Sequence, residues 1–118
     1  MVDANIKSAA HNLFLAATEK RRQKTELQTQ AQNYQRQMNS AMKQKKDEVH
    51  EHEVFIALNP NDVKTAVSLQ RIHHANDEYK KMDAQLKQKL QDIDKQVRAL
   101  DAEAASLESE SHALDMKA

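Results

Sequence analysis

The sequence predicts an all-α fold, a long antiparallel two-helix coiled-coil hairpin that associates into a helical bundle. Three observations lead to this prediction. The 118 residues include no glycine and a single proline, Pro60, close to the midpoint. Charged residues make up 31% of the chain and aromatic residues 3%, a composition typical of long helices and coiled coils. Apolar residues recur at steps of three and four on both sides of Pro60, which is the period of a helical stripe.

The first arm is expected over about residues 3–58. Its stripe consists of small or apolar residues: Ile6, Ala10, Leu13, Ala17, Leu27, Ala31, Tyr34, Met38, Ala41 or Met42, Val49 and Ile56. Between Ala17 and Leu27 the stripe passes through Lys20 and Lys24 instead. Lysine is a good helix former, so we expect the helix to continue through this break with a weaker core.

The turn is expected at residues 58–62, with the sequence Leu58-Asn59-Pro60-Asn61-Asp62. Proline has no backbone N–H to donate, and it disfavours the α conformation for the residue before it. Asn61 or Asp62 then offers a side-chain oxygen to cap a second helix. The whole chain, 1–118, is therefore interpreted as one helical hairpin.

The second arm is expected over about residues 63–114. Its stripe is Leu69, Ile72, Ala75, Tyr79, Met82, Leu86, Leu90, Ile93, Val97, Leu100, Ala104, Leu107 and Leu114, with Ser111 as the polar member. Two successive steps of four, ending at Leu90, form a stutter that unwinds a left-handed supercoil locally. If the chain folds back at Pro60, facing residues have numbers that sum to about 120, which pairs Met38 with Met82.

Catalytic, cofactor and metal sites are not indicated by any motif. The sequence has six histidines and no cysteine. His50 and His52 lie two residues apart, so they point to different sides of a helix and make poor joint metal ligands. Two helices alone also provide no deep cleft in which burial would shift the pKa of a carboxylate. We therefore expect a protein that is not an enzyme and that has no cofactor.

Membrane and export signals are likewise not indicated. The apolar run at residues 13–17 is far shorter than the ~20 residues of a membrane span. It is also too short for the apolar region of a signal peptide, and no basic segment of the usual kind precedes it. The sequence predicts no membrane span and a cytoplasmic location.

Two clusters of apolar residues are wider than one partner helix requires. They supply the candidate association residues, which are Leu13, Phe14, Leu15, Phe55, Ile56 and Leu58. An apolar arc of this width indicates that a further helix packs there, from a second copy or from another helical protein. The expected function is protein–protein interaction, as a scaffolding or spacer element.

A basic belt at residues 20–46 suggests an alternative function. It contains eight Lys or Arg residues and one Glu, although the chain as a whole has zero formal net charge. Its candidate anion-binding residues are Lys20, Arg21, Arg22, Lys24, Lys43, Lys45 and Lys46. The alternative is a module whose belt grips nucleic acid or an acidic protein partner. No interleaved aromatic residue offers base stacking, and basic runs on helices are commonly just a solvated face.

Overall fold

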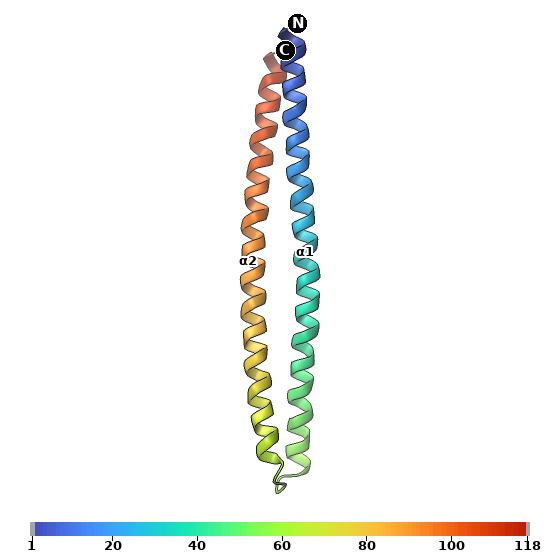
Figure 1. Ribbon diagram of the computed structural model, residues 1–118, viewed down its shortest axis with the longest axis vertical. Helices are drawn as coiled ribbons and strands as arrows, with labels where there is room; N and C mark the ends of the chain where they lie inside the picture. The colour runs from blue at the N-terminus through green and yellow to red at the C-terminus, as the bar shows by residue number, and fades with distance from the viewer. Residues whose placement is uncertain (1, 118) are drawn as a thin grey trace. The chain divides into compact units, whose positions relative to one another are not determined.

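The chain folds as an all-α hairpin of two long helices, which confirms the predicted hairpin; its association into a bundle stays a prediction. The computed structural model describes residues 2–117. Helix α1 spans Val2–Leu58 and helix α2 spans Thr65–Lys117 (Figure 1). The two helices run in opposite directions and pack against each other.

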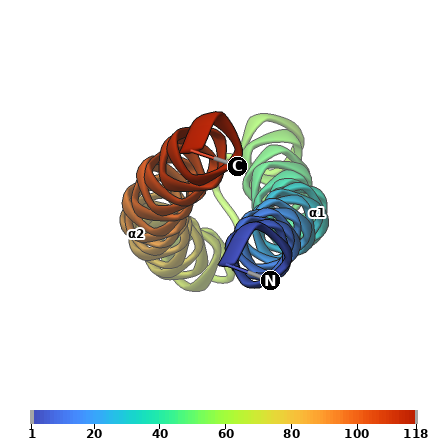
Figure 2. The same ribbon diagram turned by 90° about the horizontal axis from the view of Figure 1, so that it is seen from above.

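The hairpin divides into two compact units, each with a segment of both helices. The terminal unit comprises Met1–Ala31 and Gln91–Ala118, and the turn unit comprises Gln32–Leu90. Within the terminal unit, the beginning of α1 lies beside the end of α2 (Figure 2). Each unit therefore builds its own section of the seam between the helices.

The connection between the helices is held by polar groups around Pro60. Asn59 closes α1, because both its backbone N and its side-chain Nδ2 donate to the carbonyl oxygen of Phe55, at 2.9 and 3.0 Å. Asp62 caps α2 by accepting a hydrogen bond from the backbone N of Lys64 at 2.8 Å. The Thr65 hydroxyl donates to the carbonyl oxygen of Asn59 at 2.9 Å and ties the two helix ends together.

Helix α2 begins at Thr65, slightly later than the expected start at residue 63. The capping side chain of Asp62 engages the backbone two residues ahead, so Val63 and Lys64 belong to the connection. The connection therefore comprises residues 59–64 and is centred just beyond Pro60.

The facing pairs agree with the predicted sum of about 120 to within a few residues. The hydroxyl of Ser111 donates to the carbonyl oxygen of Ala10, a pair that sums to 121, and Lys45 forms an ion pair with Glu78, a pair that sums to 123. The small excess over 120 follows from a connection that is centred just beyond the proline.

Small residues form the tightest part of the seam, in the terminal unit. Ala10, Ala17 and Ala104 are 1%, 1% and 0% exposed. The hydroxyl of Ser111, also buried, reaches the carbonyl oxygen of Ala10 at 2.7 Å. On each helix these residues lie seven apart, so small side chains meet at every second turn and the two backbones approach closely there.

The predicted stripes agree with the observed burial except at Leu69. In the turn unit the buried positions are Ser68, Ala75, Leu86 and Met42, whereas Leu69 is 47% exposed. Ser68 occupies the seam because it continues the three- and four-residue steps through Ala75, which places Leu69 one position off the contact line. Hydrophobicity alone would predict that Leu69 is buried and Ser68 exposed. The helical period gives the opposite and correct assignment.

The seam leucine and isoleucine should dominate stability. We expect Leu86→Ala and Ile93→Ala each to lower the free energy of unfolding by about 2–4 kcal/mol, because both side chains are buried. Chemical denaturation followed by circular dichroism measures this loss. Leu69→Ala is the control, since an exposed leucine should cost much less, and equal losses at all three positions would contradict the assigned seam.

Candidate functional site

The seam leaves the large apolar side chains incompletely buried. Among residues 3–117, no large side chain is fully enclosed. Leu27, Tyr34, Leu100 and Leu107 are half-buried even though they lie on the contact line. A helix with one neighbour is covered on one side only, so the flanks of its apolar stripe still face solvent.

In the terminal unit, the predicted association residues take two different positions. Leu13 is half-buried on the seam. Phe14 and Leu15 are 54% and 50% exposed, and they lie beside the seam as the sequence predicts. This places two adjacent large apolar side chains on the solvent side of α1, where a further helix would find them.

In the turn unit, Phe55 and Ile56 are half-buried and Leu58 is 75% exposed. The structure adds four exposed apolar residues that were not assigned as association residues: Val54, Val63, Val67 and Leu69. Val63 is exposed because it lies in the connection and not in α2. The recurrence of valine and leucine at residues 63–69 is the sequence signal that would have found this cluster.

An open groove of about 500 Å³ lies between the helices of the turn unit. It is lined by Glu51, His52, Phe55, Lys64, Val67, Ser68 and Arg71. Phe55 and Val67 give the groove an apolar interior, while Glu51 lies on the α1 side and Arg71 on the α2 side. The groove therefore combines an apolar centre with rims of opposite charge.

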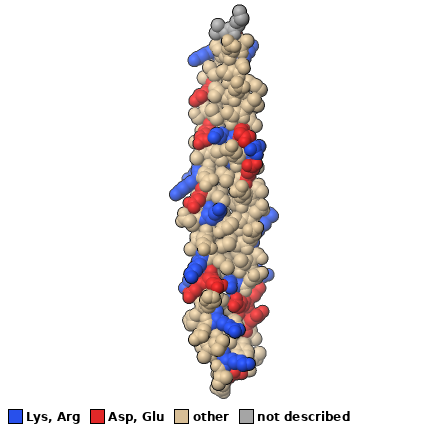
Figure 3. All heavy atoms as spheres, in the orientation of Figure 1, with Lys and Arg blue, Asp and Glu red and all other residues tan. Residues whose placement is uncertain are grey.

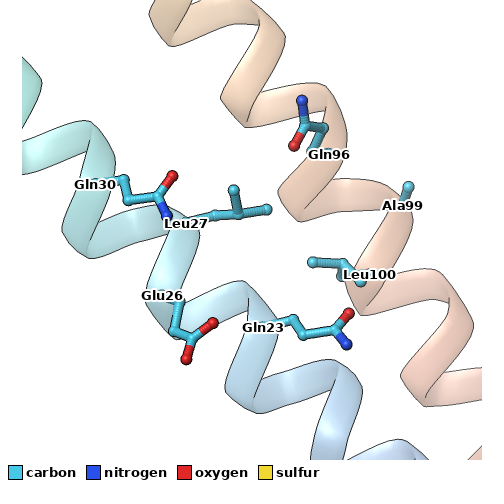
Figure 4. A pocket seen from close by; sticks show the side chains of 7 residues that line it. All are labelled: Gln23, Glu26, Leu27, Gln30, Gln96, Ala99 and Leu100. Atoms are coloured by element: carbon cyan, nitrogen blue, oxygen red, sulfur yellow. The ribbon is translucent and has the colours of Figure 1, made fainter.

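A second open groove, of about 410 Å³, lies in the terminal unit. Leu27 reaches from α1 toward α2, and Gln23 lies beside Leu100 (Figure 4). Gln30 and Gln96 add further amides to the lining. This groove carries an apolar strip bordered by amides and has no cluster of basic groups or opposed charged rims.

The basic residues at the start of the predicted belt form ion pairs across the terminal unit. Arg21 Nε and Nη2 donate to the two carboxylate oxygens of Glu108 at 2.7 and 3.1 Å, a bidentate arrangement. The Nζ atoms of Lys20 and Lys24 reach carboxylates of α2 at 3.1 and 2.9 Å. Their partners are Glu103 for Lys20 and Asp101 for Lys24. The two lysines that interrupt the stripe are thus satisfied by acidic side chains of α2.

The other candidate anion-binding residues are also largely paired. Arg22 Nε donates to Glu19 at 2.9 Å, and Arg22 also pairs with Glu26. Lys45 pairs with Glu78 and lies 3.5 Å from a carboxylate oxygen of Glu48. On the face shown in Figure 3, Lys and Arg side chains adjoin Asp and Glu side chains at several levels.

Lys46 and Lys43 differ from the other belt residues. Lys46 Nζ lies 5.2 Å from the centre of the Tyr79 ring, a cation–π contact. Lys43 lines a small groove of about 250 Å³ beside Tyr79 and has no ion-pair partner among the described residues. Five of the seven candidate residues are therefore engaged within the chain by carboxylates, which reduces the positive charge available to an external anion.

Three glutamates have pKa values below the ordinary 4.5 because basic side chains donate hydrogen bonds to them. The donors are Arg22 to Glu19, Lys45 to Glu78 and Arg21 to Glu108. A carboxyl group whose pKa is lower in the folded chain stabilises the fold above its unfolded pKa. That contribution is lost as the pH falls through the lower, folded value.

Acidification should therefore destabilise the terminal unit. We expect Arg21→Gln to lower the thermal midpoint at pH 7, by less than Leu86→Ala, and the difference from wild type to vanish as the pH falls well below 4.5. Thermal melts across pH 2–7 measure this. Arg98→Gln removes a pair formed within α2 alone, so it should have the smaller effect. A difference for Arg21→Gln that persists at pH 2 would rule out the ion pair as its cause.

Metal and membrane sites were sought in the same residues. Residues 2–117 contain no group of three or more histidine or acidic side chains placed to hold a metal ion. In that range, neither helix contains a stretch sufficiently long and apolar to cross a membrane. His74 Nε2 instead lies 2.6 Å from a carboxylate oxygen of Glu78, one helical turn away.

Comparison with protein-family models, curated proteins and solved structures found no match to this chain.

Proposed function

We propose that this chain is a non-enzymatic coiled-coil protein that self-associates and serves as a protein–protein interaction or scaffolding element. The observation that carries the proposal is the incomplete burial of its large apolar side chains. Phe14, Leu15 and Leu58 are at least half exposed, and no large side chain among the described residues is fully enclosed. An added helix would remove this apolar surface from water.

A four-helix arrangement suits such a surface. Two hairpins packed together surround a shared core, so side chains that flank one seam become interior to the bundle. Half-buried residues such as Leu27 and Leu100 would then lose their remaining exposure. Apolar contacts of this kind respond little to salt, because they do not depend on charge.

The alternative is a binding module that uses the basic belt to hold nucleic acid or an acidic protein. We favour self-association because Lys20, Arg21, Arg22, Lys24 and Lys45 already have carboxylate partners in the chain. An external anion would have to displace those carboxylates. Binding to nucleic acid would weaken steeply with salt through counterion release, which separates the two functions.

Light scattering combined with size-exclusion chromatography tests self-association. We expect a mass of at least twice the 13.5 kDa of one chain, falling toward that value only on dilution. The same mass at low and high salt would support apolar packing. A mass of one chain at every concentration would contradict the proposed self-association.

The exposed pair in the terminal unit should contribute to this association. We expect Phe14→Gln combined with Leu15→Gln to lower the measured mass, because glutamine keeps the helix while removing apolar surface. Met116→Gln, an exposed apolar residue in the same unit, is the matched control and should leave the mass unchanged. An unchanged mass for the double variant would assign the contact to the apolar residues of the turn unit instead.

A further inference from the structure

The groove of the turn unit is bordered by two rows of residues, one from each side of the hairpin. The α1 row consists of Glu51 and Phe55, which line the groove, and of the exposed Leu58 one turn further along. The α2 row consists of Lys64, Val67 and Arg71, which all line the groove. Within each row the residues are three and four apart, so they follow one side of the helix. Lys64 belongs to its row because its carbonyl oxygen accepts the first α-helical hydrogen bond, from Ser68 at 3.0 Å.

The two rows match level by level. Glu51 lies at the level of Arg71, Phe55 at that of Val67, and Leu58 at that of Lys64, since the numbers in each pair sum to 122. That is close to the sum for Ala10 and Ser111, which touch across the terminal unit. An acidic residue, a phenylalanine and a leucine thus lie opposite an arginine, a valine and a lysine.

Two charged side chains of these rows, Glu51 and Arg71, form no ion pair within the described part of the chain. Among residues 2–117, neither Glu51 nor Arg71 has an ion-pair or hydrogen-bond partner. In the terminal unit, by contrast, Arg21 and Lys24 are held by carboxylates of α2. The turn unit therefore presents unpaired charges of opposite sign on the two sides of an apolar groove.

We infer that a second copy of this chain docks on the groove of the turn unit, about a two-fold axis parallel to the helices. The inference rests on the proposed self-association and names its contact. This rotation lays the α1 row of each copy against the α2 row of the other. Glu51 then meets Arg71 of the second copy, and Phe55 meets Val67 of the second copy. Leu58 lies against the methylene stem of Lys64 of the second copy, whose charged end reaches solvent.

The level-by-level match is the reason for choosing a second copy as the occupant. A two-fold interface uses the same patch twice, so the patch has to be complementary to itself. A two-fold axis perpendicular to the helices would place α1 against α1 and α2 against α2, so Glu51 and Arg71 would not meet and both charges would stay unpaired. An unrelated partner would require no match between the two rows of this chain.

Charge reversal at the two matched positions tests the contact. Glu51→Arg makes both rims basic, and Arg71→Glu makes both acidic, so each variant alone should repel its own copies. We expect each to weaken self-association at least about tenfold in dissociation constant, measured by sedimentation equilibrium. An equimolar mixture of the two variants should restore it, because a chain with two basic rims then faces a chain with two acidic rims. The chain that carries both substitutions should also recover, because it keeps one acidic and one basic rim with the two signs exchanged.

Two charge reversals away from the groove serve as controls. Glu53→Arg and Lys80→Glu change the charge by the same amount at exposed positions of the turn unit that do not line the groove. Both should leave the dissociation constant unchanged, alone or mixed. Circular dichroism of each variant checks that the helices remain formed.

The outcomes separate this inference from the proposed function. If wild type self-associates but the groove variants behave like the controls, the groove is not the contact, and self-association through another surface stands. If the single variants weaken association but their mixture does not recover, the pairing of Glu51 with Arg71 is overturned. A wild-type chain that stays monomeric at every concentration overturns both the inference and the proposed function.

Discussion

The width of the contact between two helices is the constraint on which the rest of this structure depends. A helix pair shares a single line of contact, so only residues at the centre of that line are shielded from water on all sides. Small residues meet this condition: Ala10, Ala17 and Ala104 are almost completely buried. Larger residues at neighbouring turns, such as Leu13 and Leu107, are only half-buried. The apolar surface available for association follows from this geometry and not from a separate binding motif.

The polar interruptions of the seam have a structural role that follows from the same geometry. A lysine on a narrow seam keeps its charged end at the edge, where a carboxylate of the other helix can reach it. Lys20, Lys24 and Lys45 each meet such a partner on α2. A shift of one helix along the other would separate these pairs, whereas alternating apolar residues would tolerate a shift of a whole heptad. The charged seam positions therefore help to fix which turns of the two helices face each other.

The sequence could predict features that depend on period and could not predict those that depend on local capping or side-chain conformation. The stripe from Ile6 to Ile56 was predictable because burial on a helix repeats with a known period. The start of α2 depends on which oxygen captures a free N–H, and Asp62 selects Lys64. That choice places the centre of the connection just beyond Pro60, so the facing pairs sum to slightly more than 120. The exposure of Leu69 has a related cause, because its neighbour Ser68 fits the period better.

The candidate sites divide in the same way. Exposure of Phe14 and Leu15 followed from their position beside the stripe, and it was therefore predictable. The pairing of the basic belt with carboxylates was not predictable, because the net charge of a segment does not show which acidic side chains will lie beside it in the fold. Arg21 meets Glu108 only after the chain has turned back on itself. The same folding leaves Glu51 and Arg71 at one level of the turn unit without partners. Charged side chains that pair within the chain help to fix the register of α1 against α2. Charged side chains left unpaired beside the groove of the turn unit remain available to fix the register of a second copy.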